Sequence, residues 1–533
     1  MLAALCAFPS LAAPPAATTL PDGGRVTAGA ASISQSGARM DVTQTTDRAV
    51  LEWNRFDIGA AAQVNCAQPS ASSISLNRVL AGEASQIYGR LTANGQVWLI
   101  NPAGVMFGPG SRVDVGGLVA STLDTLDADF LAGKAKIQRN GATGKIVNQG
   151  EIATADGGLV ALLAPEVRNE GIISARLGNV VLAAGERVTL DAGADGFLKV
   201  AVDPATISAV VENRHVIQAD GGQVLMSAQA ADRLLSAVVA NSGTVQARAL
   251  EHRAGRILLL ADMDHGEVRH DGLLDASAPL PPGGGGAGGE GANGGFIETS
   301  AAKVGVGDTA RVTTLAENGQ IGTWLIDPND YPIAASAGNI TGAQLATNLG
   351  GTNITISTAT QGTAGGNGDI FVNDAVSWSA NTTLSLQAQR DIRINANITA
   401  TGNGAGLILG HGAGRNYYLQ GAKVTLSGTA PTLKIGTAGA EDNYIVINSL
   451  GVAGDATTTS LQGMKNNLTG KYALGSDIDA GATAGWNGGS GFLPIAFGGS
   501  NNNGCATCFT GWHVRWTWPR NKRVDDQSRH HRL

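Results

Sequence analysis

The sequence predicts an all-β protein folded as a right-handed parallel β-helix (β-solenoid) with N-terminal capping strands. Three observations lead to this fold class: short apolar strands cut off by turn residues, an internal repeat, and an unusual composition. The chain has 533 residues, of which 75 are glycine and only 15% are charged. About a quarter of the residues of an ordinary globular protein are charged. The hydrophobic content of 43% argues against disorder, because the chain has apolar surface to bury.

The stretch from Gly89 to Asp124 carries the clearest strand pattern. Its apolar segments are Val97–Ile100, Val105–Phe107, Val113–Val115 and Leu118–Val119, and its turns are Asn94-Gly95, Asn101–Gly104 and Gly108–Gly110. Asn and Gly tolerate positive φ and Pro presets its own φ, which makes these turns physically defined. Strands this short do not form a wide sheet. They suit a chain that bends at fixed intervals and stacks on itself.

An internal repeat follows. Asn148–Ile152 recurs as Asn169–Ile173, and degenerate copies begin at Asn213, Asn241 and His270. A second element, Gly-Gly or Gly-Asn before an apolar strand, occurs at 157–158, 178–179 and 221–222. The copies lie about 20 to 30 residues apart, or about twice that where we expect a copy to be missing, and such periods indicate a solenoid. β-branched alternation indicates strands, with a helical excursion allowed at 232–240.

The second half of the chain continues the strand pattern. Inward apolar residues alternate with polar ones, as one-sided burial requires. The pairs are Ile354/Ile356, Ile370/Val372, Leu384/Leu386, Ile392/Ile394, Leu407/Leu409, Val424/Leu426 and Leu433/Ile435. Crossovers between parallel strands are strongly right-handed, which sets the predicted hand of the coil.

The N-terminal part is expected to close one end of the stack. Short strands are predicted near Arg25-Val26, Ala31–Ile33, Ala49–Trp53 and Arg55–Ile58, with a short helix or loop at 123–130. A repeat stack needs its terminal edge covered against edge-to-edge association. We therefore expect Trp53 and Phe56 to be core or cap residues.

The segment Gly89–Asp124, together with Val50–Val79 before it, closely resembles the N-terminal secretion domain of filamentous haemagglutinin-like exoproteins, the passengers of bacterial two-partner secretion. That family carries an Asn-Pro-Asn-Gly turn after an apolar strand. Here the turn is Asn101-Pro102-Ala103-Gly104, so Ala103 replaces one Asn. The resemblance implies that Asn94, Asn101, Pro102 and Gly104 form part of a secretion signal. It implies recognition by an outer-membrane transporter with periplasmic domains, which we expect to occur while the segment is extended, through strand addition.

Composition excludes several other classes. A net charge of −7 over this length gives no electrostatic case for nucleic-acid binding. No apolar run reaches the roughly 18 residues of a membrane-spanning helix. The four cysteines (Cys6, Cys66, Cys505 and Cys508) form no disulfide framework. Cys505 and Cys508 lack a partner motif at zinc-finger spacing, so a small disulfide loop or two free thiols remain the alternatives.

No catalytic, cofactor-binding or metal-binding residue is predicted. The acidic clusters Asp124/Asp127/Asp129 and Asp262/Asp264 do not repeat at the coil spacing that paired catalytic carboxylates need, so solvated turns are expected. His215, His252, His265, His270 and His411 are scattered. The GGNGD sequence at 365–369 occurs once and does not match a calcium-binding repeat.

These patterns predict six segments. Residues 1–17 are an incomplete signal peptide, 18–135 a two-partner secretion domain, 136–278 β-helix repeats, 279–295 a Gly/Pro-rich loop or linker, 296–511 a continuation of the β-helix, and 512–533 an aberrant tail. In the tail, Trp512, Trp516 and Trp518 become Gly codons when the reading frame shifts by one base, which predicts a frameshifted end.

The predicted function is that of a secreted, non-enzymatic adhesin, exported through the periplasm and outer membrane to the cell surface or medium. A carbohydrate-active β-helix enzyme is the first alternative, and aligned carboxylates in one groove would favour it. The stalk of a contact-dependent toxin is the second. The adhesion ligand cannot be read from the residues.

Overall fold

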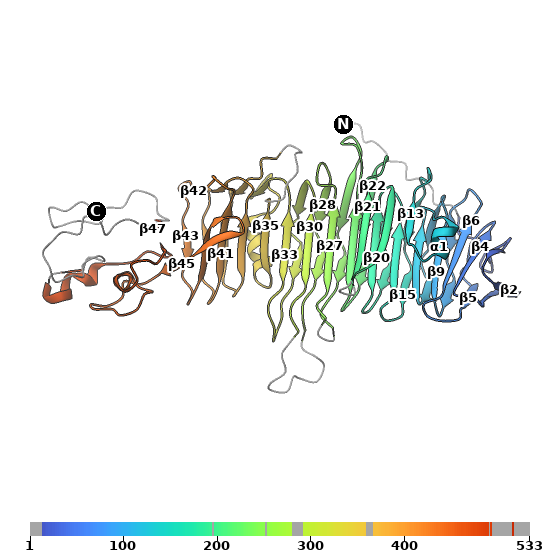
Figure 1. The fold of residues 1–533 in the computed structure, drawn as a ribbon, viewed down its shortest axis with the longest axis horizontal. Coiled ribbons are helices and arrows are strands. Elements are labelled where there is room, and N and C mark those ends of the chain that lie inside the picture. Colours follow the sequence, from blue (N-terminus) through green and yellow to red (C-terminus); the bar gives the residue numbers. More distant parts are fainter. Residues whose placement is uncertain are drawn as a thin grey trace. The chain divides into compact units, whose positions relative to one another are not determined.

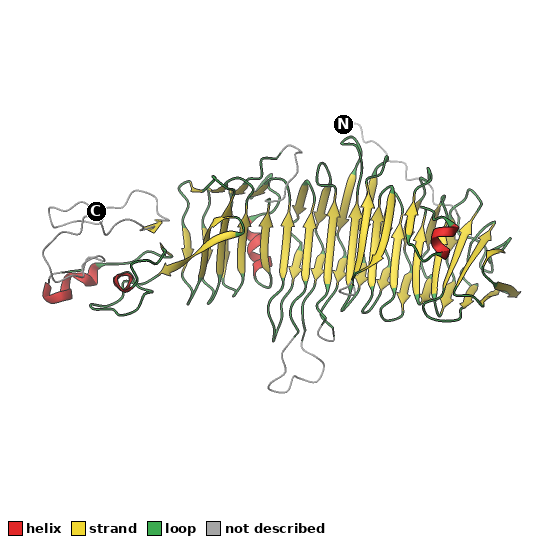
Figure 2. Cartoon of the chain, viewed as in Figure 1, coloured by secondary structure: helices red, strands yellow, loops and turns green. Residues whose placement is uncertain are grey.

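The computed structural model describes residues 13–193, 197–250, 253–279, 292–358, 366–489, 491–492 and 514–515. Nearly all the regular structure is strand, with few helices (Figures 1 and 2). The chain divides into two compact units: Met1–Ala302 with Thr309–Gly322, and Lys303–Asp308 with Thr323–Leu533. Among the described residues, no helix is long and apolar enough to cross a membrane.

In the first unit, three short strands make one coil, and three parallel sheets run along the stack. One coil consists of β14 (Lys145–Asn148), β15 (Glu151–Thr154) and β16 (Leu159–Leu163). Each strand pairs in parallel with its counterpart in the next coil, so that Ile146 lies beside Val167, Ile152 beside Ile173 and Val160 beside Val180. The predicted fold class, an all-β parallel β-helix with N-terminal capping strands, is confirmed.

The three sheets of this unit are named here by their order in the coil. The first contains β7 (Ser85–Ile87), β10 (Gly104–Phe107), β14, β17 (Glu166–Asn169), β22 (Ala209–Asn213), β25 (Ala237–Asn241) and β28 (Glu267–His270). The second contains β2 (Ala31–Ser36), β3 (Arg39–Gln44), β5 (Gln63–Ala67), β8 (Arg90–Ala93), β11 (Arg112–Val115), β15, β18 (Ile172–Ser174), β23 (Val216–Gln218), β26 (Thr244–Gln246), β29 (Leu273–Asp275) and β32 (Arg311–Thr313). The third contains β1 (Arg25–Ala28), β4 (Arg48–Trp53), β6 (Ile74–Val79), β9 (Gln96–Ile100), β12 (Gly117–Ser121), β16, β19 (Asn179–Ala184), β24 (Gln223–Ala228), β27 (Arg256–Ala261) and β30 (Phe296–Ser300).

The N-terminal strands close the first coil with antiparallel pairing. β1 runs antiparallel to β4, and β2 forms a hairpin with β3, which then pairs in parallel with β5. Trp53 and Phe56 are buried, and their rings meet edge to face with centroids 5.4 Å apart. The Trp53 indole N–H donates to Asn77 Oδ1 at 3.0 Å, so the polar end of this large side chain is satisfied. Both residues are therefore core residues beside the cap, as predicted.

The predicted repeat corresponds to a buried column of amides at one corner of the coil. Asn148 Nδ2 donates to Asn169 Oδ1, Asn169 Nδ2 to Asn213 Oδ1, and Asn213 Nδ2 to Asn241 Oδ1, each at 2.8 Å. Asn241 Nδ2 then lies 3.3 Å from His270 Nδ1. These five side chains are at most 1% exposed, so each amide depends on the next coil for its hydrogen bonds. We call them the corner ladder.

One detail of the repeat prediction was wrong. Asn169 and Asn213 are 44 residues apart, which suggested a missing copy, yet they pair directly in adjacent coils. The extra residues form a hairpin, β20 (Arg187–Ala192) and β21 (Leu198–Asp203), that leaves the coil and returns to it. The helical excursion allowed at 232–240 was also wrong, because that region is a turn followed by β25, whose alternate side chains are buried.

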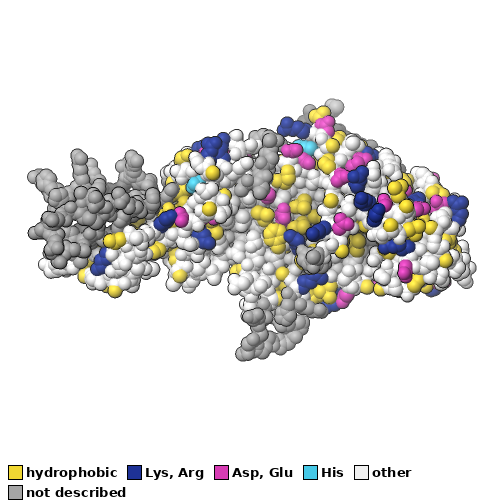
Figure 3. Space-filling view, in the orientation of Figure 1, with side chains coloured by type: hydrophobic (Ala, Val, Ile, Leu, Met, Phe, Trp, Pro, Cys, Tyr) yellow, Lys and Arg dark blue, Asp and Glu magenta, His cyan; other side chains and the backbone are white. Residues whose placement is uncertain are grey.

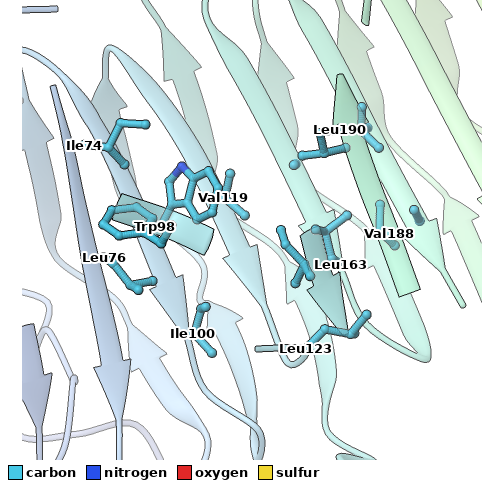
Figure 4. Close-up of a cluster of buried hydrophobic side chains, with 14 of the residues drawn as sticks. Ile74, Leu76, Trp98, Ile100, Val119, Leu123, Leu163, Val188 and Leu190 are labelled. Atoms are coloured by element: carbon cyan, nitrogen blue, oxygen red, sulfur yellow. The ribbon is translucent and has the colours of Figure 1, made fainter. Parts of the chain in front are cut away.

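The β20–β21 hairpin covers the outer face of the third sheet. It pairs antiparallel with β13 (Lys136–Gln138). Phe130 of the short helix α1 (Asp127–Leu131) joins the same buried cluster as Val188 and Leu190, part of which is drawn in Figure 4. We call these four elements the cover. Their apolar side chains, Phe130, Ile137, Val188 and Leu190, pack with residues that point outward from the coil, including Ile74, Leu76, Trp98, Ile100, Val119 and Leu163. The first unit therefore has a second apolar core outside the coil.

The second unit is built on the same plan. One parallel sheet contains β33 (Thr323–Asp327), β35 (Asn353–Ser357), β38 (Thr383–Gln387), β41 (Gly406–His411) and β44 (Thr432–Thr437), another β34 (Tyr331–Ile333), β36 (Ile370–Val372), β39 (Ile392–Ile394) and β42 (Tyr417–Leu419), and a third β37 (Val376–Trp378), β40 (Ile398–Ala400) and β43 (Val424–Leu426). The remaining elements are β31 (Lys303–Val306), α2 (Gly342–Leu349), β45 (Ala440–Ile447), η1 (Gln462–Asn466), β46 (Tyr472–Leu474), η2 (Gly481–Gly489) and β47 (Val514–Arg515). The apolar pairs predicted from Ile354/Ile356 to Leu433/Ile435 are buried throughout.

Several predictions fall largely or wholly outside the described residues. These are most of the signal peptide at 1–17, most of the Gly/Pro-rich stretch at 279–295, the Cys505/Cys508 pair, and the tail at 512–533 apart from the two residues of β47. His252 and the first residue of the GGNGD sequence also lie outside. They stay predictions.

Candidate functional site

Asn101 is the buried first residue of the turn between β9 and β10. Its side-chain Oδ1 accepts the N–H of Ala103 at 3.0 Å, and its carbonyl accepts the N–H of Gly104 at 2.9 Å. Its Nδ2 donates to the Glu83 carbonyl at 2.9 Å and to Ser85 Oγ at 3.0 Å. Asn101 has no exposed surface. One amide thus both closes its own turn and ties that turn to the preceding coil.

The other residues of this turn have distinct roles. Pro102 is exposed and Ala103 is half-buried. Gly104 has φ of +124°, and a Cβ placed on it would meet the Lys145 carbonyl at 2.8 Å, so only glycine fits. The replacement of Asn by Ala at 103 leaves the turn closed, because the bond from the Ala103 N–H uses the backbone. Pro102 is the part of the turn most open to a partner.

Asn94 lies at the other end of the same strand. Its Oδ1 accepts the Gln68 N–H at 2.7 Å and its Nδ2 donates to the Gln68 carbonyl at 2.8 Å. The side chain therefore pairs with the backbone of the preceding coil much as a strand residue would. The four predicted residues flank β9 at both ends, with Asn94 before it and the Asn101 turn after it.

The predicted acidic clusters prove to be structural. Arg78, whose side chain is 15% exposed, contacts Asp124 at 3.0 Å and Asp127 at 2.9 Å, which ties α1 to β6. This is a tighter arrangement than the solvated turn expected there. Asp262 accepts the N–H groups of Asp264 and His265 at 2.8 and 3.0 Å, which is a turn as predicted. A polar pocket of about 530 Å³ lies beside the first cluster, with Asp124, Asp129, Asp203, Lys136 and Arg187 among its lining residues.

Sequence reasoning missed a row of acidic residues in the second unit. Asp330, Asp369 and Asp391 precede β34, β36 and β39, and Asn416 precedes β42. Asp330 Oδ1 accepts the Asp369 N–H at 2.9 Å, Asp369 Oδ1 accepts the Asp391 N–H at 3.0 Å, and Asp391 Oδ1 accepts the Asn416 N–H at 3.2 Å. The repeated pattern of an acid, an apolar residue, any residue and an apolar residue (DYPI, DIFV, DIRI) was the signal that could have found it.

Because these carboxylates are aligned, they could in principle form the catalytic pair of the alternative enzyme function. Burial raises the pKa of Asp369, but hydrogen bonds from Arg390 and from the Asp391 N–H outweigh burial and lower it below its usual value. A carboxylate held ionised by such bonds is a poor proton donor near neutral pH. Within the described ranges, no group of three or more His, Cys, Asp or Glu side chains is arranged to hold a metal ion. The row is a device that fixes one coil on the next.

Comparisons with known proteins agree with the fold and with the N-terminal region. Residues 17–273 match the family model described as the TPS secretion domain, TPS standing for two-partner secretion. Two proteins of Haemophilus influenzae, each described as a heme/hemopexin-binding protein, are 34% identical over 253 residues and 30% identical over 248. The matches cover 46% and 42% of this chain but 28% and 26% of those proteins, so the chain matches less than a third of the length of these curated relatives.

A solved structure shows the same fold. The HMW1 secretion domain from Haemophilus influenzae matches with a TM-score of 0.53 at 21% identity, over 77% of this chain and 100% of that chain. The sequence match over residues 17–273 therefore supports one class of protein, the passenger exoproteins. That class is the passengers of two-partner secretion, whose secretion domain residues 17–273 of this chain match. Such passengers cross the outer membrane to the cell surface or the medium, which confirms the predicted localisation.

Proposed function

We propose that this chain is a non-enzymatic, filamentous haemagglutinin-like adhesin that an outer-membrane two-partner secretion transporter with periplasmic domains exports. The observation that carries the proposal is the match of residues 17–273 to the secretion domain. Asn94, Asn101, Pro102 and Gly104 are the proposed signal residues. The non-enzymatic part is supported by the carboxylates that do align at coil spacing, because their oxygens accept backbone N–H groups.

The signal has to be read before the chain is folded. In the folded domain Asn101 is fully buried and its hydrogen-bonding groups are occupied within the chain. A transporter domain therefore reaches this side chain only while the segment is extended. Strand addition to the transporter's periplasmic domains fits an extended apolar segment such as 96–107.

The test compares secretion of matched variants from cells that carry the cognate transporter. Asn101→Ala is paired with Asn213→Ala, because both remove a buried amide with hydrogen bonds to neighbouring coils, and only the first lies in the proposed signal. We expect Asn101→Ala to lower the secreted amount by about tenfold, the effect of losing about 1.4 kcal/mol of recognition, and Asn213→Ala to be secreted normally.

Two results would contradict the proposal. Equal losses for both variants would show that the Asn101 turn acts through stability alone. Secretion of the wild-type chain without any transporter would show that the chain is not exported by two-partner secretion. The urea midpoint of each purified variant, measured alongside, separates a folding defect from a recognition defect.

A further inference from the structure

The outward face of one sheet in the second unit carries a row of aromatic and cationic side chains. Each of β34, β36, β39 and β42 has an outward residue at its centre, and the parallel register places Pro332 beside Phe371, Phe371 beside Arg393, and Arg393 beside Tyr418. Their inward neighbours on the first three strands are fully buried. Neighbouring strands lie about 4.8 Å apart, so the row is a continuous strip. We call it the Phe-Arg-Tyr strip.

The strip is open to solvent at its aromatic end. Tyr418 is 42% exposed in a chain with only 5% aromatic residues. The Arg393 guanidinium carbon lies 5.5 Å from the centre of the Tyr418 ring, and the Arg393 side chain is 35% exposed. This distance is within the range of a cation–π contact, which favours a position of the guanidinium close to the ring. An aromatic face and a cation are thus presented side by side.

Polar residues border the strip on both sides. Asn373 and Asn395 follow β36 and β39 on the exposed surface, joined by a 2.6 Å hydrogen bond, and the exposed Gln420 follows β42 at the equivalent position. Arg390 and Arg415 precede β39 and β42 on the other side. The strip is therefore an aromatic and cationic platform between a row of amides and a pair of arginines.

Around Arg390 and Arg393 the basic groups are more exposed than the carboxylates that accompany them. Asp369 and Asp391, which accompany Arg390 and Arg393, have side chains only 2% and 9% exposed, whereas the two arginine side chains are 31% and 35% exposed. Arg393 approaches Asp391 only at 3.5 Å, so its fork of N–H donors is largely unused by the described residues. Basic side chains gather in the part of the second unit that carries β42 (Figure 3).

We propose that the Phe-Arg-Tyr strip binds an acidic oligosaccharide, a sugar chain that carries carboxylates. The C–H face of a sugar ring is apolar and packs on Phe371 and Tyr418, as apolar surface does on aromatic faces. The hydroxyls match the amides of Asn373, Asn395 and Gln420, which both donate and accept. The carboxylate matches the planar guanidinium of Arg393, whose paired donors fit its two oxygens. An extended sugar chain fits a strip that runs across several neighbouring strands.

The test uses the full purified chain and two uronate polymers, polygalacturonate and alginate, in isothermal titration calorimetry. Fully methyl-esterified polygalacturonate supplies the same backbone without charge. We expect at least one acid polymer to bind, the ester to bind more weakly, and salt to weaken the binding. Arg393→Gln and Tyr418→Ser are each expected to reduce affinity by about tenfold, the scale of one lost charge-assisted contact.

The control is Arg112→Gln, which removes an exposed arginine 3.6 Å from Glu151 in the first unit. It is expected to bind as the wild type does. Absence of binding to both acid polymers would overturn the proposal, as would equal binding of the ester, or Arg393→Gln and Tyr418→Ser variants that bind normally. Circular dichroism checks that the variants are folded, and Arg393→Lys, which keeps the charge but not the fork, should fall between wild type and Arg393→Gln. Binding uses purified chain, so its failure is distinct from a failure of export.

Discussion

At the scale of single residues, the corner ladder depends on the neutral form of His270. Asn241 Nδ2 faces His270 Nδ1 at 3.3 Å, and His270 Nε2 faces the Arg311 carbonyl at 3.4 Å. An amide N–H donates, so Nδ1 must accept and Nε2 must carry the proton. A second proton on Nδ1 would oppose the amide donor. The ladder therefore ends in a histidine that keeps both of its hydrogen bonds only in the neutral form with the proton on Nε2.

This gives a pH prediction with a definite sign. Burial lowers the pKa of His270 to about 4 in the folded chain, from 6.5. The unfolded chain therefore binds this proton first, so the contribution of His270 to stability is complete above pH 6.5 and is lost as pH falls towards 4. The loss amounts to about 3 kcal/mol. Urea denaturation of wild type and His270→Asn across this range measures it.

His270→Asn is the informative variant because Asn occupies the equivalent position in the four preceding coils. We expect it to keep the ladder and to remove this part of the pH dependence. The other ionisable groups are common to both proteins, so the difference between the two curves isolates His270. Parallel curves between pH 6.5 and 4 would refute the assignment.

At the scale of elements, the contribution of the cover to stability can be tested by substituting two adjacent residues of β20, one that points into the cover's core and one that points outward. Val188 points inward into the cover's apolar core and is fully buried, whereas Thr189 points outward, since side chains alternate along a strand. Val188→Asp places a charge in an apolar environment and should lower the free energy of unfolding by about 3 kcal/mol or more. Thr189→Asp should change it by less than about 0.5 kcal/mol.

The measurement is urea denaturation together with binding of a dye that fluoresces on apolar surface. Only Val188→Asp should bind the dye before the main transition, because the outer face of the third sheet is then uncovered. The idea that the cover is a core in its own right fails if both variants behave alike.

The elements also show how much of the fold could be predicted from the sequence. Alternating apolar residues and turns predicted the coil, the caps and the buried pairs, because burial on one face imposes a period of two. The Asn repeat even predicted the ladder's members. Of the cover, only the short helix was predicted, within 123–130. The packing of the cover on the third sheet was not predicted, because Val188, Leu190 and Trp98 look like ordinary strand residues and nothing local says that both faces of a strand are buried. Helix α2 was missed because it has only two turns, although Thr341 caps it by accepting the Gln344 N–H at 3.1 Å.

The candidate site was predicted only in part. The identity of the Asn101 turn came from resemblance, and its role in export stays a prediction. That one side chain would bond to Glu83, Ser85 and Ala103 at once could not be read from the sequence, because two of these partners lie in another coil. The acidic row from Asp330 to Asn416 was missed since long and unequal loops separate its members.

At the scale of the whole molecule, acidic and basic side chains are interspersed over the visible face of the first unit, without a single-sign field suited to nucleic acid (Figure 3). Folding of the whole chain is therefore best followed with a buried side chain of the coil, not with a surface group.

Cys66 is the free cysteine of the described residues, lies inside the first unit, and has its pKa raised by burial to about 12. Its thiol is therefore both hidden and unreactive in the folded chain.

We predict that Cys66 reports whether the chain has folded. In native buffer at pH 8, iodoacetamide should leave Cys66 unmodified, and in 6 M urea the same reagent should modify it within minutes; peptide mapping by mass spectrometry distinguishes it from the other cysteines. Applied during export, the same labelling should modify chain on the periplasmic side and spare chain outside. Rapid labelling of the native protein would contradict the buried position.

The corner ladder also bears on how such a chain can change over time. Its rungs are separated by 21, 44, 28 and 29 residues, yet the contact from rung to rung is nearly the same each time. The hydrogen bonds at the corner fix the position of one coil on the next, whereas the number of residues between two corners varies. Loops of different length and chemistry can therefore be inserted between two rungs without changing the spacing of the coils. The surface of such a fold can vary widely while its core stays the same.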